Sequence, residues 1–254
     1  MASKTITPTF YKQGNSSLDS GTNVMTCLRY GNSGASSTCD IGGSGSGSNY
    51  RNGVYIRFGG LPSVSVKSAS IKITYNLSSS DYKTASQTLT FKPVKAISSS
   101  TTGTARPSTI GSTSATATIA GSVESVSATI TSVINAAISD GSKTISIWAN
   151  SDDNRKRVSS IVLTYNTYDN ITVTYYGNGA TGVGSNSSAS GTTTSSLTTT
   201  VKYGSHTAVD LYNVGSLFVR TGHHRVSSDK AWRVGSATAT TYMSDSSVNF
   251  SSYF

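Results

Sequence analysis

Three histidines and one glutamate are among the few side chains in this sequence that could act as acid, base or metal ligand. His223 and His224 are adjacent, and His206 precedes them. Neighbouring residues of a strand point to opposite faces, so His223 and His224 are poorly placed to share one ion. The alternation therefore argues against a shared metal ion at His223 and His224, and Glu124 stands alone without a partnering base.

Asp152 and Asp153 are adjacent acids within the segment SDDNRKR. Carboxylate oxygens at this spacing could hold a structural calcium ion. A solvated loop, in which Arg155, Lys156 and Arg157 offset the acids, is the favoured interpretation. No nucleophile elbow occurs, and the segment GATGVG lacks the strand-to-helix context of a phosphate-binding loop. The sequence therefore predicts a protein that is not an enzyme, with no catalytic residues, no cofactor-binding residues and no metal site.

Cys27 and Cys39 are the two cysteines, and eleven residues separate them. No CxxC pair is present, which argues against a zinc site. The spacing is compatible with a disulfide that closes a Gly/Ser-rich loop, and equally with two free thiols.

Trp148, Trp232 and the tyrosines are the side chains that could stack on a sugar ring. A glycan-binding site would present such aromatic faces on an exposed sheet. A single tryptophan in each half of the chain is more simply a core residue.

The net charge of +9 is unevenly distributed. Residues 1–168 hold 15 Lys and Arg against 7 acids, which gives +8, and residues 169–254 hold 5 against 4, which gives +1. A basic surface can serve nucleic acid, an anionic polysaccharide or an anionic cell envelope. The lysines are scattered along strands, where they discourage edge-to-edge association. No stripe of aromatic and basic residues supports nucleic-acid binding.

Alternating segments predict the strands that must position these residues. Residues 54–58 and 71–75 alternate apolar and polar side chains around the break Gly59-Gly60-Leu61-Pro62, and we expect this pair at the centre of a β-sandwich. Val54, Ile56 and Phe58 are expected to point inward, and Tyr55 and Arg57 outward. Further strands are predicted at residues 5–11, 24–30, 87–94, 143–150 and 160–166, with an edge strand within residues 98–118.

Residues 122–140 change to a helical period. The apolar positions of this stripe are Val123, Val126, Ile130, Val133, Ile134, Ala137 and Ile138. Ser122 or Ser125 is expected to cap the start, Glu124 to lie at the positive end of the dipole, and Asp140-Gly141 to end the helix. We expect this helix to cover one end of the sandwich.

The succession YIRFGGLP, SASIKITYN, a helix, ISIWA and IVLTY resembles the jelly-roll modules named after a DNRLRE motif and their carbohydrate-binding relatives. The resemblance spans residues 5–166. It implies a jelly-roll β-sandwich for a domain placed at residues 1–168.

The segments ITVTYYGNGATG, VKYG and RTGH, followed by Trp232 and Tyr242, resemble the Listeria–Bacteroides repeat of internalin B-type surface proteins. This resemblance implies a small β-grasp-like domain at residues 169–254. It also implies a packing role for His223 and His224, which lie where the family carries an aromatic residue. Ala231 replaces the usual glycine, and VNFSSYF replaces the usual closing strand. We expect the altered closing strand to leave an edge for a neighbouring chain.

The N-terminal residues MASKTITPTF lack the apolar stretch of a signal peptide, and no apolar stretch is long enough to span a membrane. Surface-type modules without a visible signal suggest a non-catalytic structural or adhesion protein of a bacteriophage virion. Its partners would be other virion proteins or copies of itself, with a host surface glycan as a further candidate. The alternative is a carbohydrate-binding module at a bacterial cell surface.

Overall fold

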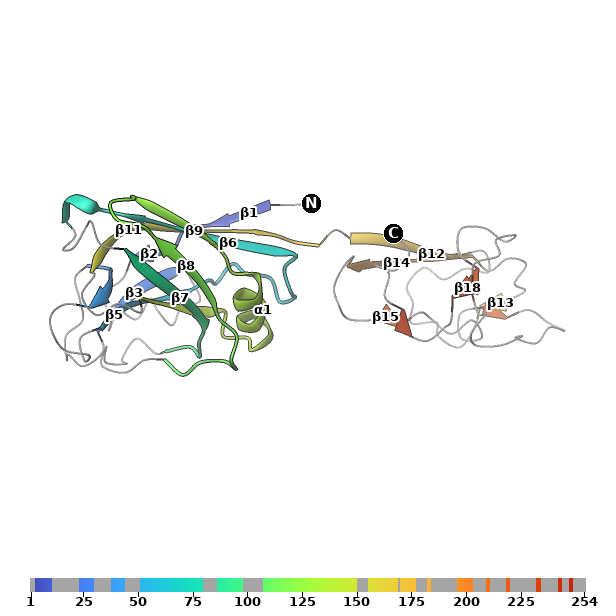
Figure 1. The fold of residues 1–254 in the computed structure, drawn as a ribbon. Helices are drawn as coiled ribbons and strands as arrows, with labels where there is room; N and C mark the ends of the chain where they lie inside the picture. Colours follow the sequence, from blue (N-terminus) through green and yellow to red (C-terminus); the bar gives the residue numbers. More distant parts are fainter. Residues whose placement is uncertain are drawn as a thin grey trace. The chain divides into compact units, whose positions relative to one another are not determined.

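The protein is described by a computed structural model, shown in Figure 1. It describes residues 3–10, 23–29, 38–43, 51–79, 86–97, 107–149 and 155–168, together with short strands of the remaining chain. The chain divides into two compact units, residues 1–167 and residues 168–254.

The first unit is a β-sandwich, in which several strands alternate between buried and more exposed residues and others are buried throughout. Its strands are β1 (Ser3–Ile6), β2 (Thr9–Phe10), β3 (Val24–Arg29), β4 (Asp40–Gly43), β5 (Arg51–Arg57), β6 (Ser68–Tyr75), β7 (Gln87–Pro93), β8 (Ala115–Ile119), β9 (Ser125–Thr129), β10 (Thr144–Ala149) and β11 (Lys156–Asn166). A short 3-10 turn, η2 (Leu77–Ser79), follows β6. The predicted mainly-β sandwich with a short helix is confirmed.

Two sheets form the layers of the sandwich (Figure 1). One sheet has the order β1–β11–β6–β9, and the other has β8–β7–β10–β5–β3–β2. Strand β4 belongs to both, because Gly42 and Gly43 pair with β5 while Asp40 and Ile41 pair with β11. Strands that pass between sheets in this way form the corners of a sandwich. The predicted central strands β5 and β6 thus lie one in each sheet, flanked on both sides.

The main core fills the space between the sheets. Val54 and Ile56 of β5 face Ile71 and Ile73 of β6 within one cluster, each at most 1% exposed. Alternation placed these residues correctly on the buried face. Phe58, which follows β5, joins the same cluster, as predicted.

The observed helix is shorter than the predicted one, which followed the apolar stripe of residues 122–140. Helix α1 (Thr131–Ser139) buries Val133, Ile134, Ala137 and Ile138. The preceding residues 125–129 form β9 instead, which pairs with β6 along its whole length. Every second residue up to Ile130 is apolar, and the ladder to β6 satisfies the backbone there.

The predicted start of the helix is therefore wrong and its end is right. Ile130 occupies the N-cap position without a side-chain cap, so neither Ser122 nor Ser125 caps the helix, and Glu124 precedes β9. The helix ends at Asp140, and Gly141 follows with a φ of 77°. Because α1 packs against β6 of one sheet and β7 and β10 of the other, it covers one end of the sandwich, as expected (Figure 1).

The described strands of the second unit form four antiparallel pairs. They are β12 (Asn170–Tyr176) with β14 (Ser196–Lys202), β13 (Gly182–Val183) with β16 (Phe218–Val219), β15 (Val209–Asp210) with β19 (Ser247–Val248), and β17 (Trp232–Arg233) with β18 (Tyr242–Met243). The start of the altered closing segment thus pairs within the chain through β19. The β-grasp identity of this unit stays a prediction.

Among the described residues, no helix has the length and apolar character needed to span a membrane.

Candidate functional site

An aromatic cluster lies on the outer face of the sheet that contains β5 and β10. Tyr55, Val94 and Trp148 are buried together, with Ile97 packed against them. Trp148 lies on the opposite face of β10 from Ile145 and Ile147, which belong to the main core. We call these four residues, Tyr55, Val94, Ile97 and Trp148, the outer-face cluster.

The ring of Trp148 rests on the backbone of Gly53, its direct partner in the ladder between β10 and β5. A Cβ atom built on Gly53 would meet three ring carbons of Trp148 at 2.4 to 2.5 Å. A side chain at this position is therefore incompatible with the observed ring. The backbone N–H of Ile97 donates a hydrogen bond to the Tyr55 hydroxyl at 3.2 Å, which satisfies the polar tip of a fully buried tyrosine.

Cationic and hydroxyl side chains surround this cluster on the same face. Lys92 of β7 is exposed and pairs with Ser146 of β10, which in turn pairs with Tyr55. Arg57 of β5 is half-buried and pairs with Thr144. Lysine and arginine bind carboxylate, sulfate or phosphate groups, and arginine can do so with two parallel hydrogen bonds.

Threonines extend the same face toward the edge strand β8. Thr88 and Thr90 of β7 pair with Thr118 and Thr116, and the hydroxyls of Thr88 and Thr118 lie 3.2 Å apart. Together with the cationic residues they form the Lys92 face, which comprises Thr88, Thr90, Lys92, Thr116, Thr118, Ser146 and Arg57 around the outer-face cluster. Such a surface combines charged donors with hydroxyls that can donate and accept.

The outer face of the other sheet has a different composition. Its residues from β6, β9 and β11 are Ser70, Lys72, Thr74, Ser125, Ser127, Thr129, Ser160, Val162 and Thr164. Lys72 is exposed at its centre. No aromatic side chain occurs among these described positions, so this Lys72 face offers hydroxyls and one cation but no ring for stacking.

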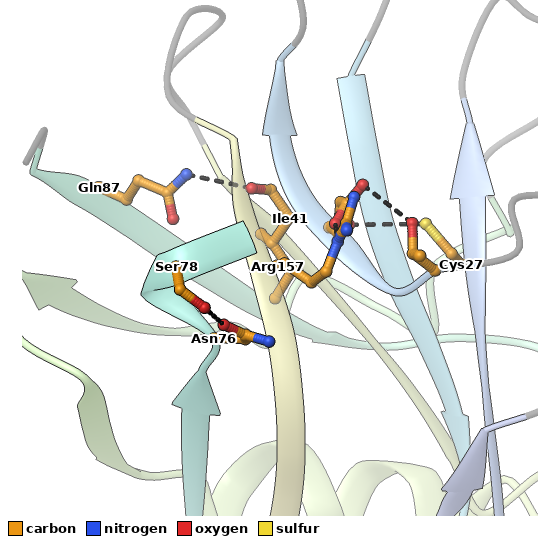
Figure 2. A network of polar contacts seen from close by, with 8 residues as sticks. Cys27, Ile41, Asn76, Ser78, Gln87 and Arg157 are labelled. Atoms are coloured by element: carbon orange, nitrogen blue, oxygen red, sulfur yellow. Dashed lines mark hydrogen bonds and ion pairs between the residues drawn. The ribbon is translucent and has the colours of Figure 1, made fainter. Parts of the chain in front are cut away.

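A polar network surrounds β4 where the two sheets meet (Figure 2). The Arg157 Nε donates to Asp40 Oδ1 at 3.1 Å, and Thr38 donates to the other carboxylate oxygen at 3.3 Å. Gln87 donates to the carbonyl of Ile41 at 3.1 Å. The carboxylate is buried and neutralised by the arginine, so this network holds the corner strand in place and offers no free acid.

Lys156 is a fully buried cation beside this network. Its amino group donates to the carbonyl of Gly121. Burial lowers the pKa of this amine, because a charged ammonium loses its hydration there. Lys156 and Arg157 were expected in or beside a solvated loop, and both instead lie within β11, which is a correction to that interpretation.

The other residues singled out from the sequence do not form a site among the described positions. Glu124 is exposed, and its backbone carbonyl accepts the N–H of Tyr75 at 2.8 Å. No group of three or more potential metal ligands converges in the described part of the chain. Six candidates fall outside the residues whose side chains are described: Asp152, Asp153, His206, His223, His224 and Trp232.

Tyr55 is where sequence reasoning went wrong on this face. Alternation predicted an outward side chain, and Tyr55 does leave the main core, yet it is fully buried. Strand β10 is buried on both faces, since all six of its residues are buried. The available signal in the sequence was the segment TISIWA, in which an apolar Trp occupies a position that alternation assigns to the outside.

A family model described as carbohydrate-binding module family 96 matches residues 26–172. This range includes β4 to β11 and the whole Lys92 face. None of the curated proteins compared with the chain matches it. The match supports the carbohydrate-binding part of the predicted jelly-roll resemblance, whereas the DNRLRE type and the internalin B-type repeat stay predictions.

The match also distinguishes between the two functional hypotheses. It supports a carbohydrate-binding role, and it therefore favours the predicted alternative over the virion structural role, which has no supporting observation here. Carbohydrate-binding modules are non-catalytic and usually act outside the cell or at its surface. This agrees with the prediction of a non-enzyme for the matched residues.

Proposed function

The chain belongs to carbohydrate-binding module family 96, and from this premise we propose that its sandwich binds a polysaccharide at the Lys92 face. The observation that supports this choice is the set of polar side chains that surround the outer-face cluster, namely Lys92, Arg57, Thr88 and Thr90. Tyr55 and Trp148 are 0% and 7% exposed, so they support this surface from beneath and do not present a ring face to a ligand. Hydroxyls and cations can bind the hydroxyl groups of sugars and the acidic substituents of polysaccharides.

An acidic polysaccharide is the ligand class that the charge favours. Residues 1–168 carry a net charge of +8, whereas the remainder carries +1. Lys92 and Arg57 bring two of these cations onto one face of the sandwich. Attraction between exposed charges is screened by salt, so binding should weaken as ionic strength rises.

The experiment compares two exposed lysines that lie on opposite faces. Lys92→Ala removes a cation from the Lys92 face, and Lys72→Ala is the matched control on the other sheet. Binding of the full chain to a polyuronate, a sulfated glycan and a neutral glucan would be measured by affinity electrophoresis. We expect Lys92→Ala to weaken binding to the acidic polymers by roughly 2- to 5-fold, the effect of one exposed charge contact, and Lys72→Ala to leave it unchanged.

Three outcomes of this experiment would each contradict a different part of the proposal. A loss with Lys72→Ala alone would move the site to the opposite face. Equal retention by the neutral glucan and the acidic polymers would refute the acidic specificity. No retention by any polysaccharide, with the protein folded, would contradict glycan binding by this chain.

A further inference from the structure

Cys27 and Cys39 lie together in the main core. Cys27 is on β3, opposite Val54 of β5, and Cys39 immediately precedes the corner strand β4. Their side chains are 1% and 4% exposed. The thiol of Cys27 lies 3.6 Å from the carbonyl oxygen of Asp40, the residue that follows Cys39, and both cysteines are free thiols in this structure.

We propose that these two thiols form a structural disulfide that joins β3 to β4 when the chain folds in an oxidising environment. This inference draws on the usual location of the family but not on glycan binding at the Lys92 face, and it adds a covalent site. The chain has two cysteines in total, so an intramolecular disulfide has only this pairing available. Disulfides persist in extracellular proteins, where carbohydrate-binding modules usually act.

The oxidant in this reaction is a small-molecule disulfide such as oxidised glutathione. The thiolate of one cysteine attacks a sulfur of the oxidant, forms a mixed disulfide and releases one glutathione thiolate. The second cysteine thiolate then attacks the protein sulfur of the mixed disulfide and releases the second glutathione. The two protons lost by the cysteines are taken up by the two released thiolates, so two protein thiols are oxidised and one glutathione disulfide is reduced.

The position of the pair determines when this exchange occurs. Both sulfurs are buried, and the pKa of Cys39 is raised by its hydrogen bond to Cys27 and by burial. Disulfide exchange requires an accessible thiolate, so the folded protein should react slowly. The disulfide should therefore form during folding, before the core closes over it.

The bond would also strengthen the corner of the sandwich. The carbonyl of Cys39 accepts the N–H of Val158 at 2.7 Å, and Asp40 accepts from Arg157, both on β11. Fixing Cys39 to β3 would thus hold β4 against both sheets. Closing a ring of this size should raise the midpoint of thermal unfolding by roughly 5 to 10 °C relative to the reduced protein.

The test uses the full chain, unfolded with reductant and refolded in a buffer of reduced and oxidised glutathione. Remaining thiols are blocked with iodoacetamide, and intact mass and peptide mapping follow. We expect a product that has lost two hydrogen atoms, carries no alkyl group and yields a Cys27–Cys39 linked peptide. Its thermal midpoint should fall on reduction, whereas a Cys27→Ala/Cys39→Ala variant should not respond to reductant.

Wild-type protein alone can overturn the proposal, so it does not depend on whether the variant folds. Recovery of folded protein with both cysteines alkylated would show that the pair stays reduced. A linked peptide whose formation leaves the thermal midpoint unchanged or lower would contradict a stabilising disulfide. Neither result bears on glycan binding, because the affinity measurement can be made on reduced protein.

Discussion

Gly53→Ala should destabilise the sandwich because Trp148 occupies the space that a side chain needs. A Cβ atom at Gly53 would lie 2.4 Å from Cδ2 of Trp148, whereas carbon atoms in contact prefer about 3.5 to 4.0 Å. The ring would have to move by roughly 1 Å. Trp148 is only 7% exposed, so its neighbours oppose that movement.

Two opposing terms determine the size of the effect. Overpacking of this kind costs about 1 to 3 kcal/mol. Replacing glycine by alanine also restricts the unfolded chain, which stabilises the folded state by about 0.4 to 1 kcal/mol. The two ranges together give a fall in the free energy of unfolding of about 0 to 2.6 kcal/mol, and their midpoints give about 1.3 kcal/mol.

Urea unfolding monitored by tryptophan fluorescence measures this change. A Trp232→Phe background leaves Trp148 as the remaining tryptophan, so the signal reports on the sandwich. Gly60→Ala is the matched control, because its Cβ would lie 3.5 Å from Ile6, an ordinary contact. We expect that control to be neutral or to raise the free energy of unfolding by up to about 1 kcal/mol.

A double-mutant cycle identifies the cause of the loss. In a Trp148→Ala background the ring is absent, so Gly53→Ala should cost nothing or stabilise slightly. This pair would be followed by circular dichroism, since the fluorescent side chain is removed. An equal effect of Gly53→Ala in both backgrounds would refute the steric explanation.

Three further predictions test the core, its pH dependence and the division of the chain. Ile134→Asp should lower the free energy of unfolding by roughly 3 kcal/mol or more in a urea melt, because it buries an unpaired charge. Ser132→Asp, on the exposed side of α1, should have little effect. Equal urea melts of the two variants would show that the apolar stripe is not buried. Tyr75→Phe should be neutral or stabilising by up to about 1 kcal/mol, since its buried hydroxyl has no hydrogen-bond partner among the described residues. Burial also raises the pKa of Tyr75, so the stability linked to its neutral hydroxyl is fully present below about pH 10 and is lost as the pH rises further. In melts above about pH 10, Tyr75→Phe should therefore retain more of its stability than the wild type. Limited proteolysis should cut near residues 165–171 and leave a stable N-terminal fragment, and a single uncut core would contradict two domains.

The sequence could predict the main core because the sandwich obeys simple alternation. Val54, Ile56, Ile71 and Ile73 are spaced two apart and are buried in the two central strands. The turn at Gly59 and Gly60 follows from residues that cannot continue a strand. Local chemistry was sufficient wherever one face of a strand met the core and the other met water.

Alternation and helical period compete in residues 125–138, and only the partner strand decides between them. Val126 and Ile130 fit a four-residue step, yet Val126, Ala128 and Ile130 also fit a two-residue step. The edge of β6 carries backbone N–H and C=O groups that need partners. Pairing with them makes residues 125–129 a strand. A single sequence does not indicate which segments lie beside each other, so the helix start was predicted too early.

The Lys92 face was also beyond prediction for a physical reason. It is assembled from β5, β7, β8 and β10, whose order in the sheet does not follow the order of the chain. Lys92 and Tyr55 lie on one row only because Ser146 pairs with both of their strands. The residue types were visible in the sequence, whereas their assembly depends on long-range pairing.

The pairing of β1 with β11 has a consequence for how this sandwich can be combined with other proteins. Ser3 pairs with Asn166, so the chain enters and leaves the first unit through neighbouring strands (Figure 1). A unit whose two ends adjoin can be inserted into a surface loop of a host protein without stretching either connection. The same closeness permits circular permutation, with the old ends joined by a short Gly/Ser linker and new ends opened elsewhere on the surface. This sandwich is therefore suited to domain insertion, by which its Lys92 face would be added to an unrelated scaffold.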